Sequence, residues 1–241
     1  MKKVFMFVSI LFVLIITGCG KNDDEIVMVT EAGFAPYEYY DNGEIVGVDV
    51  DIAKEIAKEL GKKLVIKDVA FDSIINEVKT GKADFGAAGI SYSDERAKEV
   101  DFSINYSVSK QVVIVKDDSN IKSTNDIFDK SIAVQLGSIA DTFISEKYPN
   151  ANIIRKKKYL SAIEDLKNDK VDCVVMDELP AKEILISNSG LKILPGFLTN
   201  DSYGMIVKKG NTELLNTINT VLNRLVQDGT IDSYIIKHTG K

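Results

Sequence analysis

Two segments of this chain, 88 residues apart, have nearly the same pattern: Ile75–Asp84 and Ile163–Asp172. Each predicts a short amphipathic helix, a turn containing lysine, an aspartate, and then an apolar run. The repetition indicates that one α/β unit has been built twice. In such units the loops at the carboxyl ends of the strands hold ligands, so two units that face each other frame a cleft.

The amino terminus has the pattern of an export signal. Lys2 and Lys3 precede an apolar stretch from Val4 to Ile16, and small residues then lead to Cys19. The apolar stretch is too short to cross a bilayer, which takes about 20 residues.

Residues 16–19 also resemble a bacterial lipobox, in which the cysteine is acylated and becomes the new amino terminus. The alternative is a plain secretory signal with an incidental cysteine. We predict a signal peptide over 1–18 and a lipidated tether over 19–25. A palmitate-type anchor on Cys19 would hold the protein on the extracytoplasmic face of a cell membrane.

The charge and the cysteines exclude other classes. Removing residues 1–18 takes away Lys2 and Lys3 and changes the net charge from −6 to −8. Such acidity argues against nucleic acid as a partner. Once Cys19 is lipidated, only Cys173 remains, so no internal disulfide can form, and Cys173 is expected in the core.

The rest of the chain alternates between strand and helix patterns, which predicts parallel sheets covered by helices. Asp49 or Asp51 is a candidate cap for a helix that ends at Leu60. A capping box is predicted at Ser161–Glu164, and Asn211 is the expected cap of a long final helix with Gly229 beyond its end.

Two strand-like crossings, near 109–115 and 203–208, indicate that the chain leaves one lobe, builds a second and returns. Lobe 1 is predicted over 26–109 and 204–241, and lobe 2 over 110–203. Such a double crossing can act as a hinge.

Several motifs, in order, resemble the family-3 extracellular solute-binding proteins of amino-acid ABC transporters. They are Phe34–Tyr39, Gly47–Asp51, Gly81–Asp84, Ser91–Arg96, Val100–Ser103 and Val134–Ser138. The resemblance runs from about Ile26 to the end of the chain. It implies a two-lobed α/β periplasmic-binding-protein (Venus-flytrap) fold with a two-strand hinge.

A free amino acid needs a fixed cation for its carboxylate and an anion for its ammonium. Arg96 offers a planar fork that grips a carboxylate, although taken alone it could be an ordinary surface arginine. The resemblance implies that Arg96 and the Ser91 amide hold the carboxylate, while the Gly89 carbonyl receives the ammonium.

From the second lobe, Ser138 and Ile139 begin a helix whose free N–H groups favour an anion. Asp177 is the expected anionic partner of the ammonium. It follows Asp172 by the same five residues that separate Gly89 from Asp84. The alternative for Asp177 is a helix cap, and both roles can coexist.

Specificity is expected from the side-chain pocket. Phe34 and Phe71 match aromatic positions that sandwich the ligand in relatives, and otherwise they are core residues. Glu31 matches a position where an acid meets a cationic side chain, and otherwise it is a solvated loop acid. It favours a polar ligand, with arginine and lysine as candidates. Ala87 and Ala88 replace hydroxyls that many relatives carry, which leaves the ligand's identity open.

Catalysis has little support in this chain. The only histidine is His238, and no catalytic, metal-binding or cofactor motif is present. Cyclohexadienyl dehydratases resemble the same fold and use an acid in the cleft, so Asp177 or Glu31 keeps an enzyme open as an alternative. A ligand-sensing receptor is another.

The sequence thus predicts a monomeric, lipid-anchored binding protein without catalytic residues, cofactor or metal. It would capture a polar L-amino acid, with basic ones among the candidates, and deliver it to an ABC permease.

Overall fold

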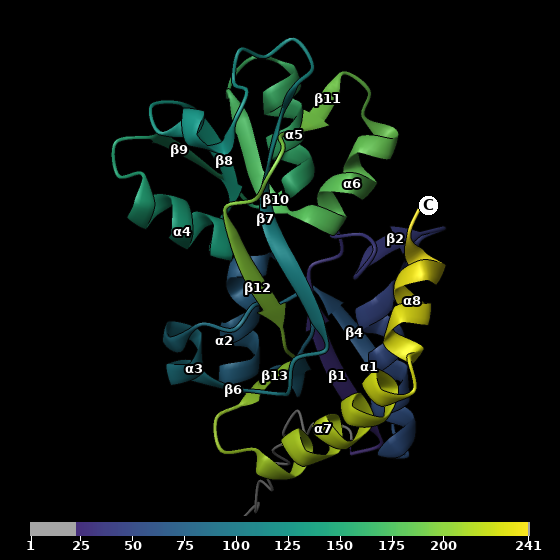
Figure 1. Ribbon diagram of the computed structural model, residues 1–241. Helices are drawn as coiled ribbons and strands as arrows, with labels where there is room; N and C mark the ends of the chain where they lie inside the picture. The colour runs from purple at the N-terminus through teal and green to yellow at the C-terminus, as the bar shows by residue number, and fades with distance from the viewer. Residues whose placement is uncertain (1–22, 241) are drawn as a thin grey trace, which may run out of the picture.

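The computed structural model describes residues 23–240, which form two α/β lobes connected by long strands (Figure 1). The predicted signal peptide and Cys19 lie outside these residues. Within 23–240, every helix is too short or too polar to span a membrane.

The first lobe is built on a five-stranded sheet in the order β4-β1-β5-β13-β6. Its strands are β1 (Glu25–Thr30), β4 (Lys63–Asp68), β5 (Phe85–Gly86), β6 (Val100–Phe102) and β13 (Ile206–Lys208). Its helices are α1 (Val48–Glu59), α2 (Ile74–Lys79), α3 (Asp94–Glu99), α7 (Thr212–Gln227) and α8 (Thr230–His238), with the short 3-10 helix η1 (Phe71–Ser73) before α2. A small hairpin, β2 (Tyr39–Asp41) and β3 (Glu44–Val46), precedes α1.

The second lobe contains a six-stranded sheet, ordered β11-β7-β10-β8-β9 with β12 also paired to β7. Its strands are β7 (Ser107–Lys116), β8 (Ser131–Gln135), β9 (Asn152–Lys156), β10 (Cys173–Asp177), β11 (Leu191–Ile193) and β12 (Thr199–Tyr203). Its helices are α4 (Ile139–Lys147), α5 (Tyr159–Lys167) and α6 (Glu178–Ser187), with the 3-10 helix η2 (Thr124–Ile127) before β8.

The crossing segments are β7 and β12, which pair antiparallel from Ser107 opposite Tyr203 to Gln111 opposite Thr199. Figure 1 shows both strands running from one lobe to the other. The two-strand hinge region thus exists as an element, while the residues at which the lobes divide stay a prediction.

The repeated aspartates have the same structural role in both lobes. Asp84 accepts a hydrogen bond from Val27 N at 2.7 Å, and its own N–H donates to Val27 O at 2.8 Å. Asp172 makes the same pair of bonds with Ser131, both at 2.8 Å. Each aspartate therefore ties the strand that follows it to the start of a neighbouring parallel strand.

Alternate side chains of β1 pack on opposite faces of the first sheet, as strand geometry requires. Met28 faces the core under α1 and α7, whereas Val29 packs with Ile74 and Val78 of the α2 layer. In the second lobe Cys173 is fully buried, as predicted for a small core residue.

The predicted cap of α1 is wrong. The N-cap is Gly47, with φ 136°, and Asp49 and Asp51 lie in the first turn of the helix. A Cβ on Gly47 would lie 2.1 Å from the Tyr37 carbonyl oxygen. A long-range backbone contact therefore sets the helix start.

Of the other helix predictions, one is wrong and one is confirmed. The capping box at Ser161–Glu164 is wrong, because α5 already begins at Tyr159 with Lys158 as N-cap. The cap of α7 is confirmed, since the Asn211 side chain accepts from Leu214 N. Gly229 does follow α7, but it is also the N-cap of α8, which the sequence analysis did not predict.

Candidate functional site

A narrow cavity lies between the two lobes, with free space of only about 10 Å³. All the residues that the sequence analysis assigned to the ligand line it: Glu31, Phe34, Phe71, Gly89, Ser91, Arg96, Ser138, Ile139 and Asp177. The rest of its lining was not predicted: Glu38, Ala88, Gln135 and Tyr159.

Arg96 lies in the first turn of α3, where its N–H donates to the capping Ser93 Oγ at 3.2 Å. Its guanidinium donates from Nη1 to Ser91 O at 2.6 Å and from Nη2 to Gly137 O at 2.8 Å. Gly137 belongs to the second lobe, so Arg96 connects the two lobes. Burial lowers the pKa of Arg96 to about 10, so the side chain stays charged at neutral pH.

The guanidinium of Arg96 also lies over the Phe71 ring, at 5.4 Å from its centroid. This cation–π contact fixes the plane of the fork at the cavity wall. Phe71 belongs to η1 and is only partly buried. It is therefore a wall residue of the cavity rather than an ordinary core residue.

The second lobe presents the start of α4 to the cavity. Ser138 is the N-cap, and its hydroxyl accepts from Asp141 N at 3.1 Å. Gly137, with φ 76°, turns the chain from β8 into the helix. The first-turn N–H groups at Ile139 add a partial positive charge on the same side of the cavity as Arg96.

Asp177 forms the negative pole at the end of β10 and is only 6% exposed. Its Oδ1 accepts from Gln111 Nε2 at 2.9 Å and from the Tyr203 hydroxyl at 2.6 Å. Both donors are neutral and come from the crossing strands β7 and β12. Burial raises the pKa of Asp177, and these hydrogen bonds oppose the shift. Asp177 occupies the N-cap position of α6, yet its side chain makes no cap hydrogen bond.

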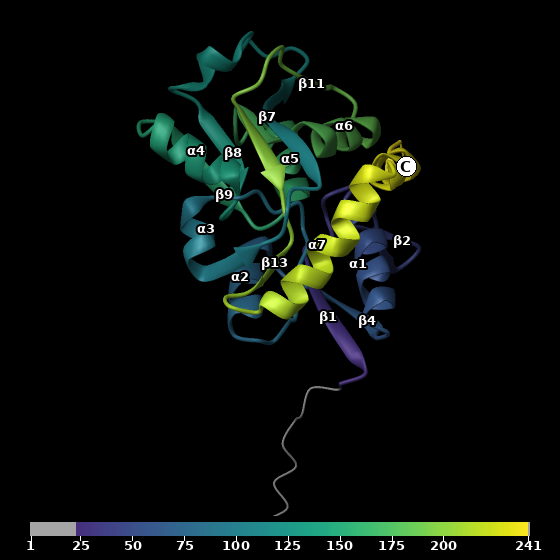
Figure 2. The same ribbon diagram turned by 60° about the horizontal axis from the view of Figure 1, so that its bottom comes forward.

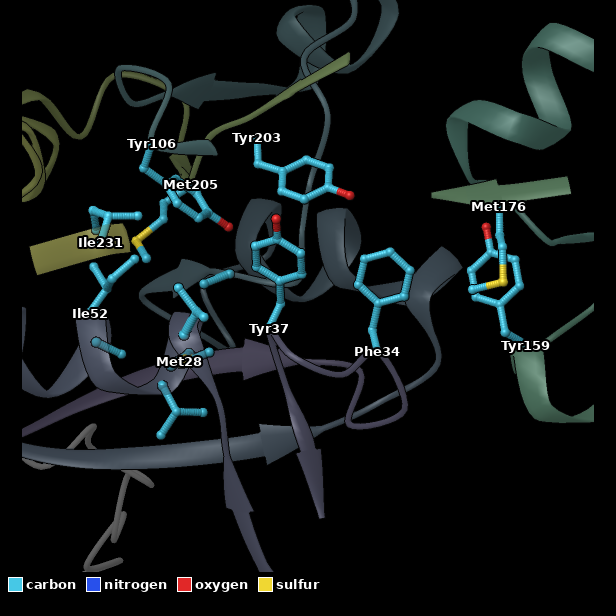
Figure 3. Close-up of a cluster of buried hydrophobic side chains, with 14 of the residues drawn as sticks. Met28, Phe34, Tyr37, Ile52, Tyr106, Tyr159, Met176, Tyr203, Met205 and Ile231 are labelled. Carbon is cyan, nitrogen blue, oxygen red and sulfur yellow. The ribbon is translucent and has the colours of Figure 1, made fainter. Parts of the chain in front are cut away.

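Phe34 lies where the two lobes meet, and its ring stacks on Tyr159 of α5 with centroids 5.8 Å apart. Figure 3 shows Phe34 on the first lobe and Tyr159 on the second, with Tyr37 and Tyr203 on the side of Phe34 away from Tyr159. Phe34 also stacks on Tyr37 at 6.1 Å, so it joins the core to the cavity.

Gly89 has φ 53°, and a Cβ there would lie 2.8 Å from a ring carbon of Phe34. Glycine is therefore required on both steric and conformational grounds. The Gly89 N–H donates to Asp49 Oδ2 at 3.0 Å, which fixes the peptide at the cavity wall.

The two glutamates of the cavity differ in their partners. Glu31, 2% exposed, accepts from Gln135 Nε2 at 3.1 Å and lies 3.3 Å from Lys158 Nζ. Both partners belong to the second lobe. Burial raises the pKa of Glu31, and the charge of Lys158 opposes the shift.

Glu38 is 1% exposed, and no donor group among residues 23–240 hydrogen-bonds to either of its carboxyl oxygens, since its polar neighbour is another acid, Asp49. Burial, reinforced by the negative charge of Asp49, raises its pKa well above the usual range. A buried carboxyl without a donor on a cavity wall is rare in native proteins and points to a group that binds there.

The residues that sequence reasoning missed had only weak signals. Glu38 lies in the quoted motif Phe34–Tyr39, but only the tight turn that places Phe34 N on Glu38 O, at 2.8 Å, turns its side chain inward. Gln135 is the last residue of β8, and Tyr159 is the first residue of α5. In the described part of the chain, no group of three or more His, Cys, Asp or Glu side chains could hold a metal ion.

Comparison with known proteins gives relatives along almost the whole chain. The "Arginine-binding extracellular protein ArtP" of Bacillus subtilis is 28% identical over 96% of both chains. The "ABC transporter glutamine-binding protein GlnH" of the same organism is 31% identical, over 96% of this chain and 95% of the relative.

Two solved structures have the same fold. AbpA from Streptococcus pneumoniae, bound to L-arginine, has a TM-score of 0.85 at 34% identity and covers 89% of this chain and 94% of its own. An ancestral arginine-binding protein bound to glutamine has a TM-score of 0.85 at 36% identity and covers 92% of this chain and 100% of its own. The model of the bacterial extracellular solute-binding proteins, family 3, matches residues 26–241, and this chain belongs to that family.

Proposed function

We propose that this protein captures a cationic amino acid, arginine before lysine, outside the cytoplasm and delivers it to an ABC permease. The relatives include proteins named for arginine and for glutamine, so the family alone leaves the side chain open. The choice between them rests on the acids of the cavity.

The observation that carries the proposal is the buried Glu38 carboxyl without a donor. Asp177 serves the α-ammonium, and the charge of Glu31 is already balanced by Lys158 at 3.3 Å. Glu38 has neither an ion-pair partner nor a hydrogen-bond donor among residues 23–240. A guanidinium or ammonium on the ligand side chain would supply both, whereas an apolar side chain would leave a buried acid without a partner.

The Arg96 side of the cavity is suited to the ligand carboxylate. Arg96 has five N–H donors, of which two are used on the carbonyls of Ser91 and Gly137. In this proposal the remaining donors, the Ser91 amide and the first turn of α4 hold the carboxylate. Gly89 O and Asp177 receive the ammonium, and the rings of Phe34 and Tyr159 cover the aliphatic stem.

Binding is proposed to close the lobes by a population shift, because the ligand contacts residues of both lobes at once. Only the closed arrangement would bring Arg96 to the carboxylate and Asp177 to the ammonium of the same ligand. The bound state thus differs in shape from the free state, which a permease can detect.

The mature protein is further proposed to be anchored through an acylated Cys19. Mass spectrometry of the amino-terminal peptide from the membrane fraction should find Cys19 as the first residue, carrying acyl chains. The Cys19→Ala protein should appear in the soluble fraction. An unmodified amino terminus elsewhere would support a plain secretory signal instead.

Calorimetry on purified protein, dialysed free of amino acids, tests the ligand. Arginine should bind most tightly, and citrulline, its neutral isostere, should bind at least about tenfold more weakly, because a charge-assisted hydrogen bond is worth about 1.5–3 kcal/mol. In Glu38→Gln that preference should largely disappear. The matched control Glu213→Gln changes an exposed glutamate on α7 and should bind as the wild type does.

Tight glutamine binding with no arginine preference would overturn the assignment to cationic ligands. Turnover of prephenate or arogenate would support the dehydratase alternative. Binding of no amino acid at all would reject the proposed function.

A further inference from the structure

Glu38 lies next to a second buried acid, Asp49 of α1, which is fully buried. Both oxygens of Asp49 are used: Oδ1 accepts from the Tyr106 hydroxyl at 2.7 Å, and Oδ2 accepts from Gly89 N at 3.0 Å. Glu38 lines the cavity, while Asp49 is behind it, so the pair connects the ligand space to the lobe interior.

No cation offsets this pair among residues 23–240, because no lysine, arginine or histidine lies within ion-pair distance of either carboxyl. The groups that act on Glu38 from neighbouring elements are Asp49 on α1, Glu31 after β1 and Asp177 on β10. Two hydroxyls complete the surroundings, Tyr106 before β7 and Tyr37 in the loop before β2.

Two adjacent buried acids without a cation cannot both be ionised at low cost. Burial raises the pKa of Asp49 to about 6, and the pKa of Glu38 is also well above its usual range. Glu38, with no donor to stabilise its charge, is the member of the pair that holds a proton more readily.

We propose that the Glu38–Asp49 pair carries one shared proton in the ligand-free protein and that a cationic ligand side chain displaces it. This inference rests on the proposed function, because it requires a cation on the ligand. The carboxyl O–H bond breaks, the proton goes to solvent, and the ligand cation takes its place. The net charge of the pair together with its occupant stays at −1, so the interior exchanges one positive charge for another.

The exchange makes selectivity depend on pH. A proton competes with arginine but not with a neutral side chain, which leaves the protonated pair as it is. Affinity for arginine should rise by up to about tenfold per pH unit, from about pH 5 until the free pair is ionised, and should then level off. Affinity for citrulline or glutamine should lack this dependence.

Calorimetry in two buffers of different ionisation enthalpy, phosphate and Tris, counts the protons directly. Arginine binding should release up to about one proton near neutral pH, and binding of citrulline should release close to none. Arginine binding without proton release between about pH 5 and pH 8 would overturn the inference and leave the proposed function intact. Failure of arginine to bind at any pH would instead reject the proposed function.

Two variants behind the cavity assign the proton to this pair. Tyr106→Phe removes a hydrogen bond that lowers the pKa of Asp49, so the pH dependence of arginine affinity should move to higher pH. Asp49→Asn removes the neighbouring charge that raises the pKa of Glu38, so the dependence should move to lower pH. Neither side chain lines the cavity, and citrulline affinity should report any structural damage.

Unchanged pH profiles in both folded variants would show that the released proton comes from another group and would contradict the assignment. Should a variant fail to fold, proton counting on the wild-type protein still decides the question. Glu213→Gln serves again as the matched control and should reproduce the wild-type profile.

Discussion

At the scale of single residues, the site depends on which charges are already balanced. Asp177 has two hydrogen-bond donors, yet no salt bridge to any residue of the described chain is found for it. Gln111 and Tyr203 hold its side chain in place, which suits the ammonium-binding role proposed for it. Glu31 instead contacts Gln135 and Lys158 of the opposite lobe. These contacts would favour closure of the lobes as well as balance the charge of Glu31.

Asp177→Asn should weaken binding of every amino acid, charged or neutral, because the α-ammonium is common to all of them. The loss should be about tenfold to a hundredfold, which corresponds to one charge-assisted hydrogen bond. Calorimetry with arginine and glutamine checks it. A loss confined to arginine would place Asp177 at the side chain of the ligand and would contradict the assigned role.

The buried Asp49 should make the stability of the ligand-free protein depend on pH. Its pKa is raised to about 6 in the folded state, above its ordinary value. An acid whose pKa is raised by folding makes its full contribution to stability at pH values below its pKa in the unfolded state. For Asp49 this contribution is lost as the pH rises through about 6. The difference in free energy of unfolding between wild type and Asp49→Asn, followed by urea titration across this range, isolates the contribution. A difference independent of pH would contradict it.

The sequence located two cavity-lining residues through the repeat, which places them at equivalent strand ends. Gly89 and Asp177 follow the two equivalent aspartates, and both line the cavity. Glu38 escaped prediction because its inward orientation depends on the turn in which Phe34 N donates to Glu38 O. Its isolation from cations is a three-dimensional property that no local pattern shows.

At the scale of elements, the sequence patterns predicted the alternation of strands and helices, while the start of α1 depended on a distant contact. The cap of α7 is local, a single Asn211 side chain, and was predicted. The cap of α1 is not local, because Gly47 packs against the Tyr37 carbonyl, and the adjacent aspartates were mistaken for caps. Helix α5 begins two residues before the predicted box, at Tyr159, which lines the cavity.

Gly47→Ala should therefore destabilise the first lobe strongly. The new Cβ would overlap the Tyr37 carbonyl oxygen at 2.1 Å, and φ 136° disfavours any side chain. We expect a loss of more than about 2 kcal/mol in free energy of unfolding. Gly43→Ala is the matched control, since Gly43 has φ 86° with nothing within 4 Å of a new Cβ. Equal losses in the two variants would show that backbone conformation alone, without the contact, requires glycine at position 47.

At the scale of the whole molecule, the lobes touch at several places, and one of them is far from the ligand. Arg96 reaches Gly137, and Glu31 reaches Gln135 and Lys158, all around the cavity. Away from the cavity, the chain end after α8 reaches α6, where Gly240 N donates to Glu183 Oε2 at 2.9 Å. Figures 1 and 2 both place the end of α8 beside α6.

The contact between Gly240 and Glu183 joins the lobes in the closed form, so it should stabilise closure without touching the ligand. Glu183→Gln keeps an acceptor but removes the charge, which reduces the strength of such a hydrogen bond by about half. The affinity for arginine should fall by about threefold, with no change in the ratio of arginine to citrulline affinity. Small-angle scattering at subsaturating arginine should show a smaller closed fraction. Glu178→Gln, on the same helix but paired with Lys182 four residues later, should leave both measurements unchanged. A change in the arginine preference, with no change in the closed fraction, would contradict this prediction. The contact would then influence ligand selection in the cavity, and closure would depend only on the residues around the ligand.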